Sequence, residues 1–355
     1  MLSKTKQNRK NAQLKQFILR NGRVTRAEAV EHADLDIRTA TSYLEKLCKQ
    51  GFCRKENAAP DGKGRPGIIY STNLENMLFI GVLIDQNMSV DCVLCTIDGE
   101  ILKHKNWKFH TQQSKLTIFN SILDMIKNIS SSFPEKTLGG IGIAVSRWLQ
   151  PPLATFDLYS GLMKFLKKET RVEVYRTMII NARAYDAANT YKQKDVIVFH
   201  PGNVIELAIT QNSRIIQNYQ EHECTFAHLT VNKNGPKCYC GTKGCLENYV
   251  TNLALEEKLS TISPGASLSD SDNPEINKFK DEIVEYLTQA CFYLDQTYKP
   301  QLILLMLSKN IAGSVIVECK KEKLNSKINY LTTEDYAAVR GAALMAIFMA
   351  VKQYK

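Results

Sequence analysis

The sequence predicts an α/β protein in two parts, an amino-terminal winged helix-turn-helix over residues 1–73 and a two-lobed α/β body over residues 74–355. Three observations support this prediction. Residues 1–73 contain fifteen lysines and arginines against seven acidic residues. The same segment shows three helical patterns, followed by two short apolar runs on either side of a basic loop rich in proline and glycine. From Met77 onward, strand-like and helix-like runs alternate.

The composition is typical of a globular protein. The chain has 355 residues, of which 44% are hydrophobic and 23% charged, enough for two or three domains with a large core. The longest late apolar run, 341–351, is about half of the ~20 residues that a membrane span needs. The basic, polar start MLSKTKQNRKN has no apolar stretch behind it, so we find no secretory signal and expect a cytoplasmic protein. The ten cysteines are then expected to be free thiols or metal ligands.

The positive charge of the chain is concentrated at the amino terminus. The formal net charge is +10, and the fifteen basic and seven acidic residues of 1–73 account for +8, which leaves +2 for the remainder. Such asymmetry is typical of a nucleic-acid-binding module, with a solvated basic surface as the alternative.

The first two helical patterns have clear boundary signals. The first covers residues 11–22 and ends at Gly22, a residue that commonly stops helices. The second begins with TRAE, where Thr25 can cap the helix and Glu28 can return the hydrogen bond as a capping box.

The third pattern, capped by Asp36 and stopped by Gly51, is the predicted recognition helix. Its apolar positions follow helical spacing and are expected to form a buried stripe: Ile37, Ala40, Leu44 and Leu47. The opposite face is expected to read or approach the major groove of double-stranded DNA with small or basic side chains: Arg38, Thr39, Thr41 and Ser42.

The two apolar runs after Gly51 predict a β-hairpin wing. The loop between them contains KGRPG, in which Arg65 lies between flexible neighbours and suits a narrow minor groove. Taken alone, GRPG favours a simple turn over a DNA contact. Three further basic residues are expected to neutralise DNA phosphates: Arg26, Lys46 and Lys63.

The body alternates between predicted strands and helices. Strands are expected at 78–84, 90–102 (with a turn at Asp98 and Gly99), 138–145, 195–200, 204–210 and 301–307. Residues 176–191 are expected to form a strand followed by a helix. Further helices are expected at 255–262, 279–298 and from Thr333 onward. We expect lobe one to cover about 74–190 plus 333–355, and lobe two about 191–332. Cys92 and Cys95 form a CxxC within an apolar run, so we predict packed core thiols rather than a redox pair.

The stretch CYCGTKGCLENY, with a histidine upstream, predicts a structural zinc site. His228, Cys238, Cys240 and Cys245 would complete a closed tetrahedral Cys₃His shell. Glycines in the loop allow the sulfurs to face one point. His222 is an alternative fourth ligand, and three unligated cysteines are the alternative to a metal site.

The pattern C-x-C-G-x-x-G-C-x-E, together with the upstream histidine and the winged helix, resembles the ROK family of repressors, open reading frames and sugar kinases. CYCGTKGCLE matches the zinc signature of this family at every fixed position, and AHLTV resembles the segment around its zinc histidine. Further matches are spread along nearly the whole chain. Residues 11–52, with GKGRP behind them, resemble the repressor branch, GVLIDQNMSVDCVLCTIDGEIL resembles the first hairpin of the family and VRGAALMA its final helix. The resemblance implies an actin/hexokinase-like body with a cleft between its lobes, and homodimers or homotetramers that match a palindromic operator.

The resemblance also implies that the kinase machinery is broken, so that the chain has no catalytic residues. The first phosphate hairpin reads LIDQN, where Asp85 replaces the glycine of the family. The second reads HPGNV and the third LMLSKN, and neither keeps the run of glycines that close backbone contact requires. In the catalytic Asn-Asp pair Asn181 is present, but Ala182 stands at the base position and cannot accept a proton. Asp186 is a weak candidate for a substitute base. The glutamate that precedes the zinc histidine in the family is Thr225 here.

These observations predict a pseudokinase that acts as a transcriptional repressor of carbohydrate-utilisation genes. A sugar or sugar-phosphate effector would contact Asn181, His228 and Glu247, unless these residues have a purely structural role. The alternatives are a constitutive DNA-binding protein whose body only oligomerises, and an active sugar kinase, which would require all the broken motifs to be tolerated.

Overall fold

The computed structural model describes residues 10–11, 13–15, 17–18, 21–57, 67–110, 112–146, 156–216, 224–270, 272–331 and 336–353. The chain divides into two compact units, each described by itself below. Unit one contains residues 1–182 and 338–355, and unit two contains residues 183–337, so the division falls within one helix, α6 (Ile179–Thr190). Among the described residues, no helix is long and apolar enough to cross a membrane.

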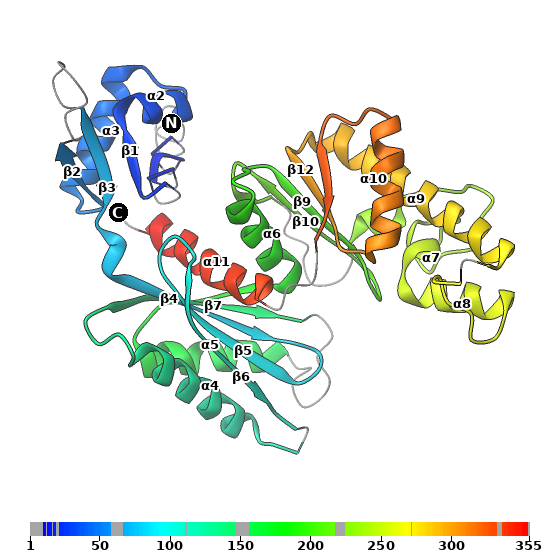
Figure 1. Ribbon diagram of the computed structural model, residues 1–355. Coiled ribbons are helices and arrows are strands. Elements are labelled where there is room, and N and C mark those ends of the chain that lie inside the picture. The colour runs from blue at the N-terminus through cyan, green and yellow to red at the C-terminus, as the bar shows by residue number, and fades with distance from the viewer. Residues whose placement is uncertain are drawn as a thin grey trace. The chain divides into compact units, whose positions relative to one another are not determined.

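The amino-terminal part of unit one is a small helical module with a three-stranded sheet (Figure 1). Its elements are β1 (Arg23–Thr25), α2 (Arg26–Ala33), α3 (Ile37–Lys49), β2 (Cys53–Asn57) and β3 (Ile68–Thr72). β3 pairs antiparallel with both β2 and β1, so the predicted hairpin is confirmed and β1 is an additional strand that the sequence analysis missed. Leu44, Phe52 and Tyr70 are fully buried between the helices and the sheet.

The predicted helix boundaries of this module are confirmed. Thr25 caps α2, and Glu28 returns the bond to the Thr25 backbone N–H at 2.7 Å, which completes the capping box. Asp36 caps α3 by accepting hydrogen bonds from the Arg38 and Thr39 backbone N–H groups, both at 3.0 Å. Gly51, just after α3, has a φ of 73°, which a residue without a Cβ adopts readily.

One burial prediction in α3 is wrong. Ala40, Leu44 and Leu47 are fully buried, but Ile37 is 58% exposed. Ile37 is the first residue of the helix, so helical spacing alone overestimated the length of the buried stripe.

The remainder of unit one is a five-stranded sheet in the order β6-β5-β4-β7-β8. Its strands are β4 (Met77–Ile84), β5 (Ser89–Cys95), β6 (Ile101–Lys108), β7 (Thr137–Val145) and β8 (Val174–Met178). β4, β5 and β6 run antiparallel, with the expected turn at Gly99, whereas β7 and β8 run parallel to β4. Cys92 and Cys95 are fully buried in β5, and burial raises the pKa of the Cys92 thiol, which agrees with core thiols.

Helices cover both faces of this sheet (Figure 1). α4 (Lys115–Ser130) and α5 (Phe156–Thr170) pack on one face, where α4 and the even-numbered residues of β4 form a common apolar core. α11 (Ala337–Gln353) lies on the other face. A Cβ at Gly81 of β4 would be 1.9 Å from the Val339 carbonyl oxygen, so glycine is what allows this helix to approach the sheet. The predicted beginning of the final helix, Thr333, lies outside the described residues.

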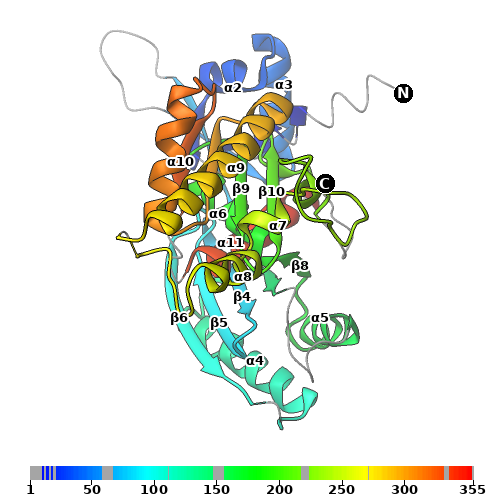
Figure 2. The ribbon, with the colours of Figure 1, turned by 90° about the vertical axis from the view of Figure 1, so that its right-hand side faces the viewer.

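Unit two is built on a second five-stranded sheet, in the order β11-β10-β9-β12-β13. Its strands are β9 (Val196–Pro201), β10 (Ile205–Gln211), β11 (Arg214–Ile215), β12 (Leu302–Leu305) and β13 (Lys327–Tyr330). Its helices are α7 (Glu247–Val250), α8 (Asn252–Ile262), α9 (Pro274–Tyr298) and α10 (Lys309–Lys321). α9 and α10 lie side by side against this sheet (Figures 1 and 2) and share a core with β9, β10 and β12.

Candidate functional site

The predicted metal ligands converge on one loop of unit two. His228 ends a short 3₁₀ helix, Thr225–His228, and the three cysteines precede α7. One ligand atom from each of the four side chains lies within 4.8 Å of all the others. The loop is closed by the Cys238 backbone N–H, which donates to the Thr242 carbonyl at 2.8 Å. Gly244 has a φ of 68°, and a Cβ there would be 1.5 Å from the Asn232 carbonyl oxygen, so the tight fold of the loop requires glycine.

The spacing of these atoms fits a zinc ion. Cys238 Sγ lies 3.5 Å from His228 Nδ1, and Cys240 Sγ lies 3.6 Å from Cys245 Sγ. A tetrahedral zinc site with its usual bond lengths separates a sulfur from a nitrogen by about 3.6 Å and two sulfurs by about 3.8 Å. Hydrogen bonds with Thr242 lower the pKa of Cys240 to about 6, which favours the thiolate that binds metal. Four protein ligands leave no position for water, as in a structural site.

The second nitrogen of the histidine is an unsatisfied buried atom. With Nδ1 directed at the cysteines, His228 Nε2 is buried and has no hydrogen-bond partner among the described residues. Buried polar atoms are rarely left unpaired, so an orphaned one is a candidate contact for a ligand. The alternative metal ligand His222 lies outside the described residues.

Tyr239 joins the histidine to the predicted ligand residue Glu247. The Tyr239 hydroxyl donates a hydrogen bond of 2.9 Å to Glu247 Oε2, and its ring lies edge-on to the His228 ring, with 5.1 Å between centroids. Glu247 is buried at the start of α7, whereas Tyr239 is 68% exposed. The sequence analysis missed Tyr239, although its position between two ligand cysteines is a signal that could have identified it.

The third predicted ligand residue belongs to the other unit. Asn181 is half-buried on α6 and precedes the boundary between the units, whereas His228 and Glu247 lie in unit two. The set of three as one binding site therefore stays a prediction. Ala182, at the expected position of a catalytic base, is fully buried, and a Cβ at Gly341 of α11 would be 1.9 Å from its carbonyl oxygen. Asp186 is buried further along α6.

The first phosphate hairpin of the kinase pattern is occupied by a side chain of the protein. Asp85 Oδ1 accepts hydrogen bonds from the backbone N–H groups of Asn87, at 2.9 Å, and Ser89, at 3.0 Å. These amides belong to the turn between β4 and β5, where a phosphate cradle would need free donors. The carboxylate would also repel a phosphate.

Four of the eight predicted DNA-contact residues line a shallow hollow of ≈ 430 Å³. It is lined by Arg26 of α2 and, from α3, by Ile37, Arg38, Thr41, Ser42 and Glu45. Thr41 donates its hydroxyl hydrogen to the Ile37 carbonyl at 2.6 Å, so only its oxygen lone pairs face outward. Thr39 is half-buried and Lys46 is exposed one turn beyond Ser42. The wing residues Lys63 and Arg65 lie outside the described residues.

Comparison with known proteins gives relatives along most of the chain. It is 23% identical over 332 residues to the xylose repressor of Bacillus spizizenii, and the aligned region covers 88% of this chain and 85% of the repressor. It is 20% identical over 355 residues to the DNA-binding transcriptional dual regulator NagC of Escherichia coli K12, covering 90% of this chain and 83% of NagC.

Solved structures show the same fold. A ROK family transcriptional regulator described as a homolog of the E. coli MLC protein superimposes with a TM-score of 0.68 at 17% identity, covering 99% of this chain and 97% of the regulator. The ROK hexokinase of Thermus thermophilus has a TM-score of 0.64 at 14% identity and covers 76% of this chain and 98% of the hexokinase. The predicted fold class, an amino-terminal module followed by a ROK-like α/β body, is confirmed. Because the ROK family model matches residues 87–347, this chain belongs to the ROK family.

Proposed function

We propose that this protein is a sequence-specific, DNA-binding transcriptional repressor of carbohydrate-utilisation genes. The observation that supports this most directly is the exposed face of α3, where Arg38, Thr41 and Ser42 line one hollow with Arg26 from the preceding helix. A helix of this kind enters the major groove with its amino-terminal residues. The repressors and regulators among its relatives match over nearly the full length of the chain.

Residues 1–73 are the DNA-binding domain in this proposal. Arg38, Thr39, Thr41 and Ser42 read or approach base edges, and Arg65 enters the minor groove from the wing. Arg26, Lys46 and Lys63 neutralise phosphates. The body forms a homodimer or homotetramer, which places two recognition helices on a palindromic operator.

Zinc has a structural role in this proposal. His228, Cys238, Cys240 and Cys245 hold the ion, and their spacing and the four-ligand set support this assignment. The ion supplies cross-links between the 3₁₀ helix and the loop before α7. His228 would bind the ion through Nδ1, the ring nitrogen that faces Cys238, which leaves Nε2 for other contacts.

A sugar or sugar derivative is the proposed effector, with His228 Nε2, Glu247 and Asn181 as its polar contacts. The orphaned Nε2 and the buried Glu247 carboxylate support a site for a ligand that both donates and accepts hydrogen bonds. If the ligand binds the free protein more tightly than the DNA-bound protein, it releases the operator by population shift.

Phosphoryl transfer is not part of the proposed function. Ala182 cannot act as a base, and Asp85 takes up the amides of the first phosphate hairpin. A second candidate function is constitutive DNA binding, with a body that only oligomerises. It is favoured by the Tyr239 hydroxyl, which already occupies an acceptor position of Glu247.

The test is selection of genomic DNA fragments by the purified protein at fixed salt, with and without a panel of sugars and sugar phosphates. Enrichment of a two-fold-related site that one sugar abolishes is the expected result. Enrichment that no sugar affects would favour the constitutive protein. No enrichment would contradict DNA binding, and ATP turnover with a sugar would contradict the absence of kinase activity.

A further inference from the structure

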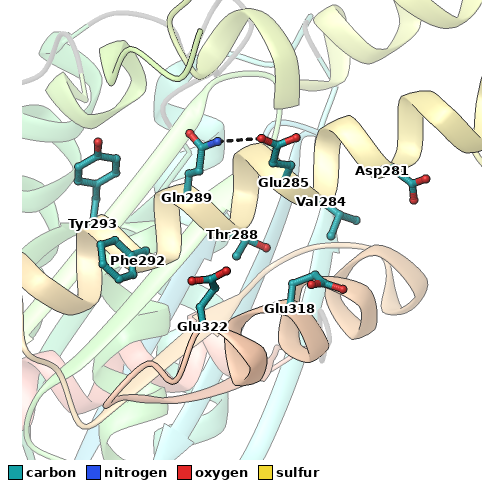
Figure 3. Close-up of a pocket in the computed structure, with 9 residues that line it drawn as sticks. All are labelled: Asp281, Val284, Glu285, Thr288, Gln289, Phe292, Tyr293, Glu318 and Glu322. Carbon is teal, nitrogen blue, oxygen red and sulfur yellow. Dashed lines mark hydrogen bonds between the residues drawn. The ribbon is translucent and has the colours of Figure 1, made fainter.

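The second unit has an acidic groove between α9 and α10 that plays no part in the proposed function. The groove has a volume of ≈ 630 Å³, and nine residues line it. Val284 and Thr288 of α9 point toward α10, whereas Glu318 and Glu322 of α10 point back toward α9 (Figure 3). Val284 and Thr288 are more than nine-tenths buried and form the floor.

The charge of the groove is opposite to that of the chain. Four of the lining residues are carboxylates, Asp281, Glu285, Glu318 and Glu322, and none is a lysine or arginine. Glu318 is paired with Lys321 at 2.6 Å in an exposed contact, and Glu285 accepts a hydrogen bond from Gln289 at 3.3 Å. The formal net charge of the whole chain is +10, so this groove is a local acidic feature of a basic protein.

Two exposed aromatic residues mark one end of the groove. Phe292 is 41% exposed and Tyr293 46% exposed, and their rings meet edge-on with 6.4 Å between centroids. Aromatic side chains beside a desolvated floor are the usual anchors of a protein interface. A surface that combines them with four carboxylates, of which Glu318 already pairs with Lys321, suits a partner with both apolar and cationic side chains.

We propose that this groove binds a basic amphipathic helix of a partner protein. The lining residues of α9 run from Asp281 to Tyr293, about 18 Å of helix at 1.5 Å per residue. This matches about three turns of a partner helix packed between two helices. Glu318 and Glu322 are one turn apart, so lysines or arginines one turn apart on the partner can pair with both. The carboxylates repel phosphates, which excludes DNA as the occupant.

The experiment measures binding of a probe peptide to the full-length protein. The probe is an amidated helical peptide of about 15 residues built from leucine, alanine and four lysines at helical spacing. We expect saturable binding of this peptide to the wild-type protein, measured by fluorescence anisotropy at physiological salt. A peptide with glutamates in place of the lysines should not bind.

Two variants and one matched control locate the binding. The double variant Glu318→Lys/Glu322→Lys should weaken binding about tenfold or more, and Phe292→Ala should also weaken it. Glu256→Lys/Glu257→Lys makes the same charge change on exposed residues of α8 that do not line the groove, and should leave the affinity unchanged. Equal losses in both double variants, or no saturable binding by the wild-type protein, would overturn the proposal. A lower oligomeric state of Phe292→Ala by sedimentation would also overturn it, because the groove would then be a contact between copies of this chain.

Discussion

Tyr239 donates its hydroxyl hydrogen to the Glu247 carboxylate at 2.9 Å, while its ring lies edge-on to the His228 ring, with 5.1 Å between the ring centroids. Two proposed zinc ligands, Cys238 and Cys240, flank this tyrosine in the chain. A ligand that takes the Oε2 acceptor position of Glu247 would therefore compete with a side chain held by the proposed zinc loop. Such competition would couple binding of an effector to the conformation of that loop.

Replacing Tyr239 with phenylalanine should tighten sugar binding. The change keeps the ring against His228 but removes the hydroxyl, which frees Glu247 for the ligand. One net hydrogen bond is worth about 1 kcal/mol, so we expect roughly fivefold higher affinity for the sugar that the genomic selection identifies, measured by calorimetry. Unchanged or weaker affinity would mean that the hydroxyl does not compete with the ligand or is itself part of the ligand site.

Replacing Cys240 with serine should remove zinc and destabilise unit two. Serine is a poor zinc ligand, and loss of the ion removes the cross-links of the loop. We expect metal content to fall in elemental analysis and the melting temperature to fall by about 5 °C or more. Cys48→Ser is the control, because Cys48 lies in α3, outside the ligand cluster, and should retain the metal. The zinc site would be refuted if the wild-type protein contained no metal and the Cys240→Ser variant had the same melting curve as the wild type.

Replacing Arg38 and Lys46 with alanine should weaken DNA binding in different ways. Loss of a base contact by Arg38→Ala should cost about 1–3 kcal/mol on the selected operator and relax its sequence preference. Loss of a phosphate contact by Lys46→Ala should weaken binding to all DNA sequences alike. It should also reduce the slope of log affinity against log salt concentration by about one. Fluorescence anisotropy over a salt series measures both effects. Lys258→Ala, at an exposed residue of α8, is the control and should change neither the affinity for DNA nor its salt dependence. Equal effects of all three variants would show that only the net charge of the protein matters.

Adding a methyl group at two glycines should have opposite effects on stability. In Gly81→Ala the new Cβ would be 1.9 Å from the Val339 carbonyl oxygen, so α11 must shift, and we expect a loss of about 3 kcal/mol. In Gly313→Ala, inside α10, the new Cβ has no neighbour within 4 Å, and we expect a gain of about 0.5–1 kcal/mol. Thermal unfolding measures both. A neutral Gly81→Ala would contradict the close packing of α11 on β4.

The features predicted well from the sequence are those whose partners are close in the chain. The capping box joins residues three apart, the Asp36 cap joins neighbours, and the three ligand cysteines lie within eight residues, so local spacing constrains each of them. Five strands of the body, β4, β7, β9, β10 and β12, were recognised from apolar runs, because burial on both faces leaves a strong signal along the chain. The partly exposed β11 and β13 were missed, and most of β6 lies beyond the predicted run.

The features that were missed depend on contacts in three dimensions that the spacing along the chain does not encode. Ile37 fits a buried stripe by its spacing, yet it is 58% exposed, because exposure depends on neighbours rather than on period. Tyr239 reaches Glu247 only because the loop folds back on α7. Gly81 is required only because α11, more than 250 residues later, lies against β4. Local chemistry therefore specified the helix ends, the most buried strands and the cysteine cluster, whereas the tertiary structure decided which side chains are exposed, which one hydrogen-bonds Glu247 and how closely a helix approaches a sheet.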